Sequence, residues 1–122
     1  MNVLRSLLFY VGYFLAIFVF GALLLPVAPL LALPARYRLL NLYNHFITAW
    51  FRWTCGVTYR VSGRERLPQG PCVILANHQC EWETIFLQIL KPPVCTVLKQ
   101  ELLRIPVFGW GLRLLHPIAL DR

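Results

Sequence analysis

The chain has 122 residues, which leaves room for one domain. Hydrophobic residues make up 58% of it and charged residues 14%, whereas ordinary soluble domains carry roughly 25% charged residues, so the composition disfavours a typical soluble protein. The formal net charge of +7 suits an anionic membrane surface. Nucleic acid is not expected as a partner, because the basic residues are scattered and no nucleic-acid-binding motif is present.

An uncharged segment begins near the N-terminus. No charged residue occurs from Ser6 to Leu25, and twenty residues of helix cover about 30 Å, the thickness of a bilayer core. We therefore expect a membrane-embedded helix within residues 1–34. Two arrangements are open: a helix that crosses the membrane, or a hairpin bent at Pro26 and Pro29 that enters one leaflet. A cleaved signal peptide is disfavoured because the apolar run is too long.

Arginine is more frequent after the apolar run than before it. Arg5 alone precedes the run, whereas Arg36, Arg38, Arg52 and Arg60 follow it. The positive-inside rule therefore predicts that the rest of the chain lies on the cytoplasmic side, and we expect the protein at the cell inner membrane.

A second helix is predicted over residues 35–55, with Pro34 at its start and Gly56 at its end. Its apolar residues recur at spacings of three and four, which indicates an amphipathic helix. This helix either lies on the membrane or packs on the domain core; the pattern shows burial but does not distinguish the two. The apolar positions are Leu39, Leu40, Tyr43, Phe46, Ile47, Trp50 and Trp53.

The remainder, residues 56–122, is expected to form the first part of an α/β domain with parallel strands. β-branched and apolar runs separated by loops predict short strands at 57–61, 72–76, 94–98 and 118–120. A helix is predicted from Cys80 or Glu81 to about Leu90, where Lys91-Pro92-Pro93 ends it. A further helix, broken near Pro106, is expected between the last two strands.

Titratable side chains gather directly after the second predicted strand. Residues 76–84 read Ala-Asn-His-Gln-Cys-Glu-Trp-Glu-Thr, and the carboxyl ends of strands are where open α/β folds place their sites. Histidine is the side chain best suited to exchange a proton near neutral pH. A neighbouring carboxylate can hold one ring nitrogen and raise the basicity of the other. His78 with Glu81 or Glu83 is thus a candidate catalytic pair.

Helical geometry bears on which acid pairs with His78. On one continuous helix, Glu83 would lie about 140° from His78 and Glu81 about 60° from it. Pairing with Glu83 therefore requires His78 to lie in the turn before the helix, which the strand-to-helix boundary provides. From the residue types alone, a structural histidine beside two solvated glutamates is the plainer alternative.

Two blocks resemble those of a known family. Asn77-His78, four residues and then Glu83 are similar to the first signature block of the glycerolipid acyltransferases, the family of 1-acylglycerol-3-phosphate acyltransferases. Lys99-Gln100-Glu101-Leu102, then Pro106, Gly109 and the segment ending at Arg122, is similar to the second block. Glu83 stands where the family more often has Asp, and Cys80 where it often has Ser.

The resemblance implies an acyltransferase reaction and roles for five residues. His78 would be the general base and Glu83 its supporting acid, while Asn77, Lys99 and Arg122 would contact the substrate. The implied reaction transfers an acyl group from acyl-CoA or acyl carrier protein to the free hydroxyl of 1-acylglycerol 3-phosphate, which is lysophosphatidic acid. The product is phosphatidic acid. The acyl donor is a substrate, and neither a cofactor nor a metal is implied.

Two alternatives stay open. The family's third and fourth blocks are not found in this sequence, so the resemblance covers only the N-terminal part of the catalytic domain. One alternative is an acyltransferase acting on another lysolipid or on glycerol 3-phosphate. The other is an inactive, truncated membrane protein that keeps the motif.

Overall fold

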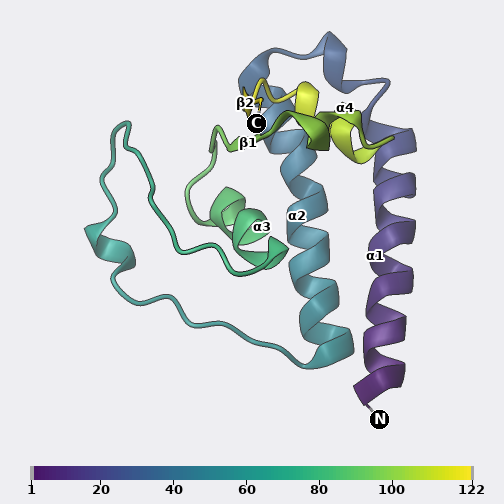
Figure 1. Cartoon of the computed structure of the whole chain (residues 1–122). Coiled ribbons are helices and arrows are strands. Elements are labelled where there is room, and N and C mark those ends of the chain that lie inside the picture. The colour runs from purple at the N-terminus through teal and green to yellow at the C-terminus, as the bar shows by residue number, and fades with distance from the viewer. Residues whose placement is uncertain (1, 122) are drawn as a thin grey trace.

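The protein is built on a pair of long antiparallel helices. The computed structural model describes residues 2–121. Helix α1 (Asn2–Leu24) and helix α2 (Leu33–Cys55) stand side by side, joined by a turn that contains a short 3-10 helix, Ala28–Leu30 (Figure 1). In the view of Figure 1 the C-terminal segment lies across the upper end of this pair, and the helix at residues 81–90 lies beside the middle of α2.

Small residues let α1 approach its neighbours closely. At Gly12, an added Cβ would overlap the indole of Trp50, whose Nε1 donates a hydrogen bond to the carbonyl oxygen of Phe9 at 3.2 Å. At Gly21, an added Cβ would overlap the side chain of Val107. The two glycines therefore fix where α2 and the C-terminal segment contact α1.

Proline and glycine mark the ends of α2 as the sequence predicts. Pro34 occupies the first turn, and Gly56 caps the C-terminus in the left-handed conformation with φ 70°. At the N-terminal end, Arg36 donates to the carbonyl oxygens of Leu31 at 2.9 Å and Pro29 at 3.2 Å. These bonds satisfy carbonyls of the interhelical turn and hold it against α2.

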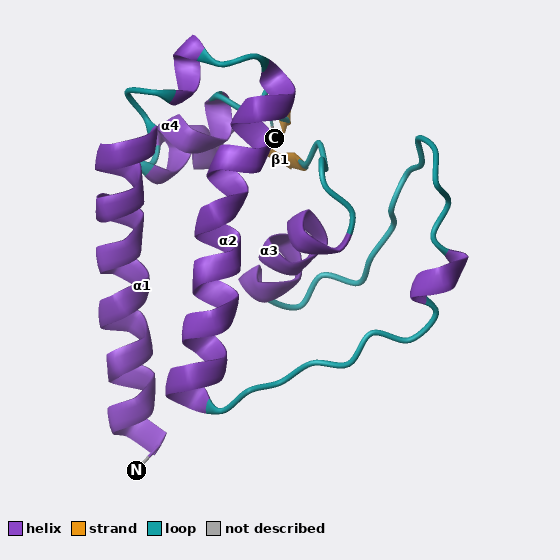
Figure 2. Cartoon of the chain, turned by 180° about the vertical axis from the view of Figure 1, so that it is seen from behind, coloured by secondary structure: helices purple, strands orange, loops and turns teal. Residues whose placement is uncertain are grey.

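Helix α3 (Glu81–Leu90) crosses beside α2 and ends at Lys91, as predicted (Figure 2). The Asn41 side chain of α2 donates to the carbonyl oxygen of Gln88 at 3.1 Å. The Gln88 amide in turn donates to the carbonyl of Val94 at 2.9 Å and to the Thr96 hydroxyl at 3.1 Å. This chain of hydrogen bonds joins α2, α3 and the strand that follows.

The sheet has two parallel strands, β1 (Val97–Lys99) and β2 (Ile118–Leu120), paired with Val97 opposite Ile118. The connection between them contains a 3-10 helix, Gln100–Arg104, and helix α4 (Phe108–Arg113). The break before α4 lies at the predicted proline. Helices with a parallel strand pair agree with the predicted α/β class.

Two of the four predicted strands are wrong. Residues 57–61 and 72–76 are extended but unpaired, and they belong to the long connection that projects away from the helices in both views. Their β-branched pattern favours extended backbone, but a strand also needs a partner edge for its amides and carbonyls. No such edge lies beside them within residues 2–121, and Val73 and Leu75 are exposed.

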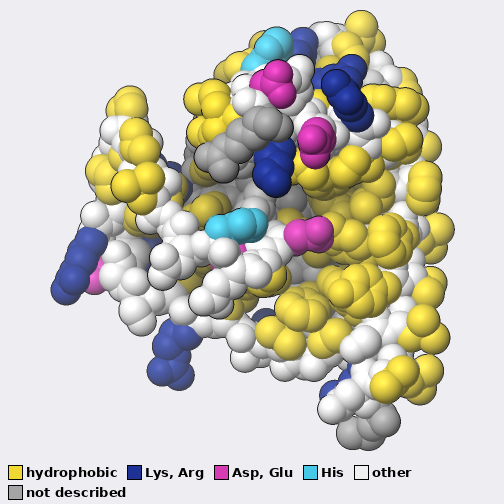
Figure 3. All heavy atoms as spheres, in the orientation of Figure 1, with side chains coloured by type: hydrophobic (Ala, Val, Ile, Leu, Met, Phe, Trp, Pro, Cys, Tyr) yellow, Lys and Arg dark blue, Asp and Glu magenta, His cyan; other side chains and the backbone are white. Residues whose placement is uncertain are grey.

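The outer face of α1 is apolar and exposed. It presents a nearly continuous hydrophobic surface in Figure 3, and it is the one described helix long and apolar enough to cross a membrane. Length and composition of this kind support membrane association only weakly. The division into residues 1–34, 35–55 and 56–122 stays a prediction. The exposed large side chains of α1 are Val3, Leu4, Leu7, Leu8, Tyr10, Val11, Phe14, Leu15, Phe18, Val19 and Leu23.

Candidate active site

His78 and Glu83 lie together at the start of α3. His78 is in the extended segment before the helix, and its Nδ1 is 3.3 Å from Oε2 of Glu83. The side chain of His78 is 69% exposed and that of Glu83 26%. The structure thus forms the pair that the sequence predicts, with His78 before the helix and not on it, although the segment is extended and not a turn. The catalytic roles of the two residues remain a prediction.

Backbone amides hold the carboxylate of Glu83 in place. Oε2 accepts hydrogen bonds from the backbone N–H of Gln79 at 3.0 Å and of Cys80 at 2.9 Å, and the Cys80 thiol is 3.7 Å from Oε1. This is a capping arrangement, in which the third helical residue reaches back to free N–H groups at the helix start. The Cys80 N–H, with smaller help from Gln79, Cys80 Sγ and His78, lowers the pKa of Glu83.

The arrangement determines which ring nitrogen of His78 is available. An ionised Glu83 accepts a hydrogen bond from Nδ1–H, so the neutral ring carries its lone pair on Nε2. A histidine held in this way can take a proton from a hydroxyl at Nε2 and later return it. The bond to Glu83 stabilises the imidazolium formed in between.

The second carboxylate, Glu81, is bonded elsewhere. Oε2 of Glu81 accepts a hydrogen bond from the Tyr13 hydroxyl of α1 at 3.3 Å. Residue types left both acids open as partners of His78, and the structure pairs His78 with Glu83. No sequence signal connects Tyr13 with Glu81, which are 68 positions apart.

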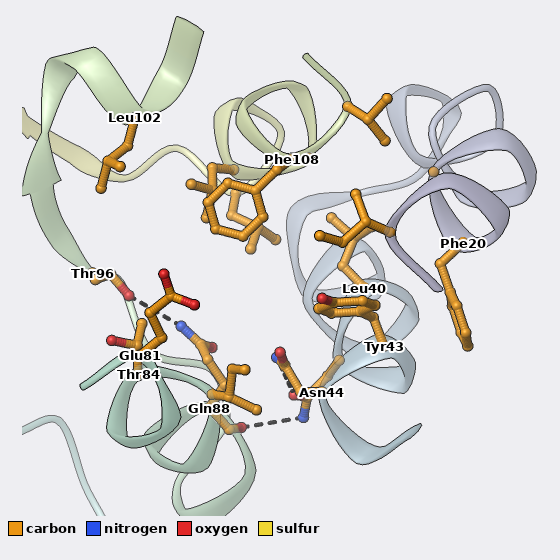
Figure 4. A pocket seen from close by; sticks show the side chains of 18 of the residues that line it. Phe20, Leu40, Tyr43, Asn44, Glu81, Thr84, Gln88, Thr96, Leu102 and Phe108 are labelled. Carbon is orange, nitrogen blue, oxygen red and sulfur yellow. Dashed lines mark hydrogen bonds between the residues drawn. The ribbon is translucent and has the colours of Figure 1, made fainter. Parts of the chain in front are cut away.

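His78 and Glu81 are among the residues that line a largely apolar cavity of about 270 Å³. It lies between α1, α2, α3 and the C-terminal elements, and Figure 4 shows side chains from each of these directed into it. The Tyr43 hydroxyl is buried without a hydrogen-bond partner among the described residues, and burial raises the pKa of Tyr43. The apolar lining is Ile17, Phe20, Leu24, Leu25, Leu40, Ile85, Leu98, Leu102, Val107, Phe108, Leu112 and Leu115.

The other predicted site residues are not among the residues that line this cavity. Asn77 is exposed next to His78, and Lys99 is exposed at the end of β1. Arg122 lies outside the described residues. Within residues 2–121, no three His, Cys, Asp or Glu side chains are grouped as a metal site would need.

The sequence is similar to known acyltransferases. The family described as Acyltransferase matches residues 58–122. A 1-acyl-sn-glycerol-3-phosphate acyltransferase of Pseudomonas aeruginosa is 45% identical over 98% of this chain and 47% of its own length. A relative from Chlamydomonas reinhardtii whose name also begins with 1-acyl-sn-glycerol-3-phosphate acyltransferase is 30% identical over 98% of this chain and 37% of its own. A 1-acyl-sn-glycerol-3-phosphate acyltransferase of Saccharomyces cerevisiae is 37% identical over 55% of this chain and 22% of its own length.

The chain spans less than half the length of each of these relatives. No solved structure shows significant similarity to it. The family match covers more than half of the chain, including the His78–Glu83 pair and the cavity residues of α3, β1 and α4. The chain therefore belongs to the acyltransferase family.

Proposed function

We propose that the protein transfers an acyl group from an acyl thioester to the free hydroxyl of 1-acylglycerol 3-phosphate, which gives phosphatidic acid for phospholipid synthesis. The observation that carries the proposal is the His78–Glu83 pair, whose histidine lines a largely apolar cavity. The names of the relatives from Pseudomonas aeruginosa and Chlamydomonas reinhardtii support the same reaction.

The chemical step follows from the state of His78. Nε2 takes the proton of the acceptor hydroxyl as its oxygen attacks the thioester carbonyl. The new C–O bond forms, the C–S bond breaks, and the proton passes from the imidazolium to the departing thiolate. Glu83 keeps Nδ1–H in place throughout, because two backbone N–H groups fix its carboxylate.

The cavity is suited to one hydrocarbon chain. Its volume of about 270 Å³ is just below the ~300–1,000 Å³ typical of small-molecule sites, and its lining is largely apolar. Each buried methylene contributes about 0.8 kcal/mol to binding. A chain in the cavity would bring its carbonyl beside His78, one of the lining residues.

Charged groups of the substrate would remain outside the cavity. Lys99 is exposed at the end of β1, and a cation of this kind can bind the phosphate of the acceptor. We assign Arg122 to the same role and Asn77 to a substrate contact beside His78. The donor is acyl-CoA or acyl carrier protein, and no cofactor or metal takes part.

The apolar face of α1 fits a lipid surface, and arginines follow the apolar run. We place the protein at the inner membrane with the site on the cytoplasmic side. Its substrates would then reach the cavity from the adjoining leaflet.

The test is acyl transfer by the purified protein in detergent, with labelled acyl-CoA or acyl carrier protein and a panel of lysolipids and glycerol 3-phosphate. We expect His78→Ala to lose at least about 100-fold in rate, the usual contribution of a general base. His45→Ala is the matched control, because His45 is exposed on α2. Full activity in His78→Ala, with native folding by circular dichroism, would refute the proposal.

A further inference from the structure

The start of α3 carries two carboxylates within five residues of one histidine, and only Glu83 is bonded to it. Glu81 lines the same cavity as His78, whereas Glu83 does not. Glu81 and His78 therefore both border the space that a substrate would occupy. Its carboxylate is held by a hydroxyl from a different helix, that of Tyr13 on α1.

An unrestrained Glu81 would interfere with a general base at this position. Carboxylates on both ring nitrogens would favour the imidazolium, since an opposite charge within about 4–6 Å stabilises the charged form by 1–3 pKa units. A carboxylate that accepted Nε2–H would also leave no lone pair for the proton of a substrate. Glu81 is only three residues from His78 along the chain and lines the same cavity, so it is the carboxylate that would compete for the second ring nitrogen.

We propose that Tyr13 is a positioning residue whose hydroxyl holds Glu81 away from His78, so that Nε2 stays free for the acceptor hydroxyl. The inference rests on the proposed function for its catalytic consequence. It assigns to α1, the apolar helix, a direct part in the site.

The other titratable groups around the cavity cannot replace Tyr13 in this role. Those that line it with His78 are Glu81, Tyr13, Tyr37 and Tyr43. The Tyr37 hydroxyl donates to the carbonyl oxygen of Leu115 at 2.8 Å. The Tyr43 hydroxyl is buried near that of Tyr13, and burial together with this proximity raises the pKa of Tyr43, but the hydroxyl has no hydrogen bond of ordinary geometry to any described residue, Glu81 included. The lining residues from β1 and α4 are uncharged. Glu81 is thus the one carboxylate of the described lining.

The test compares Tyr13→Phe with the double variant Tyr13→Phe/Glu81→Gln in the purified protein. In Tyr13→Phe we expect the acidic limb of the pH–rate profile to move up by about one unit, which lowers the rate roughly tenfold below that limb. The added Glu81→Gln should return the limb to its original position, because an amide carries no charge. Tyr10→Phe is the matched control: it removes a hydroxyl from an exposed position on the same helix.

A second measurement does not depend on activity. NMR of ring-labelled histidine, with the His78 signal assigned by loss in His78→Gln, follows protonation of the ring directly. We expect its midpoint to move to higher pH in Tyr13→Phe and to return in the double variant. An unchanged midpoint in Tyr13→Phe, or a shift that Glu81→Gln does not reverse, would overturn the inference. The ring titration decides this even if the enzyme assay rejects the proposed function.

Discussion

Gly12 offers a sharp test of how α1 is held against α2. The substitution is Gly12→Ala, which adds a single methyl group in the interior of α1. That Cβ would lie 2.6 Å from Cζ2 of Trp50 and closer still to Cε2 and Nε1. Since carbon atoms in contact lie about 3.5–4.0 Å apart, the indole or the helix must move by roughly 1 Å.

Three terms decide the expected change in the free energy of unfolding. Overpacking of this kind costs about 1–3 kcal/mol. A shifted indole also loses its hydrogen bond to Phe9, 3.2 Å long in the structure, and such a bond contributes about 0.5–1.5 kcal/mol. Alanine in a helix interior is about 1 kcal/mol more stabilising than glycine, which offsets part of these losses. The balance predicts a destabilisation of about 1–3 kcal/mol.

The assay is urea unfolding in detergent, followed by the fluorescence of the four tryptophans, of which Trp50 is one. Gly70→Ala is the control, because a Cβ at Gly70 meets no atom within 4 Å and its φ is not in the left-handed region. A gain in stability for Gly12→Ala would show that helix propensity dominates and that the close contact of α1 with Trp50 is not rigid.

Two further changes probe the site itself. Glu83→Gln should lower the acyl-transfer rate, whereas Glu83→Asp should keep most of it, because the amide cannot support the imidazolium. The pKa of Glu83 is lowered in the folded protein. Its contribution to the free energy of unfolding is therefore present above the ordinary carboxyl pKa and is lost as the pH falls through the lowered value. In Glu83→Gln, the free energy of unfolding should fall less steeply with decreasing pH over that range. Tyr43→Phe should leave stability unchanged or raise it by about 1 kcal/mol, since it removes a buried hydroxyl without a hydrogen-bond partner; a loss above that size would indicate a bonded hydroxyl.

The sequence predicted the features that depend on residues close together in the chain, above all the ends of the helices. Pro34 and Gly56 act within one turn of the ends of α2, and Lys91, Pro92 and Pro93 follow Leu90, the last residue of α3. The pairing of His78 with Glu83 was predictable for the same reason, since capping at a helix start brings the third helical residue back to the residues before the helix.

Features that depend on distant partners were not predictable in this way. Residues 72–76 have the composition of a strand, but a strand exists only where another edge supplies hydrogen bonds. The bond from Tyr13 to Glu81 joins residues from separate helices, and Tyr13 alone reads as an interfacial aromatic on an apolar helix. The cavity likewise arises from packing of four helices and has no pattern in any single segment.

Tyr13 links the packing of α1 on α2 to the geometry of the candidate site. Gly12, its neighbour, sets the distance between α1 and α2 through Trp50, and Tyr13 then reaches the start of α3 from that fixed helix. A displacement of α1 would therefore disturb the Tyr13–Glu81 bond as well as the packing. If the proposed role of Tyr13 is correct, Gly12→Ala should reproduce part of the pH–rate shift of Tyr13→Phe, because both changes release the same carboxylate.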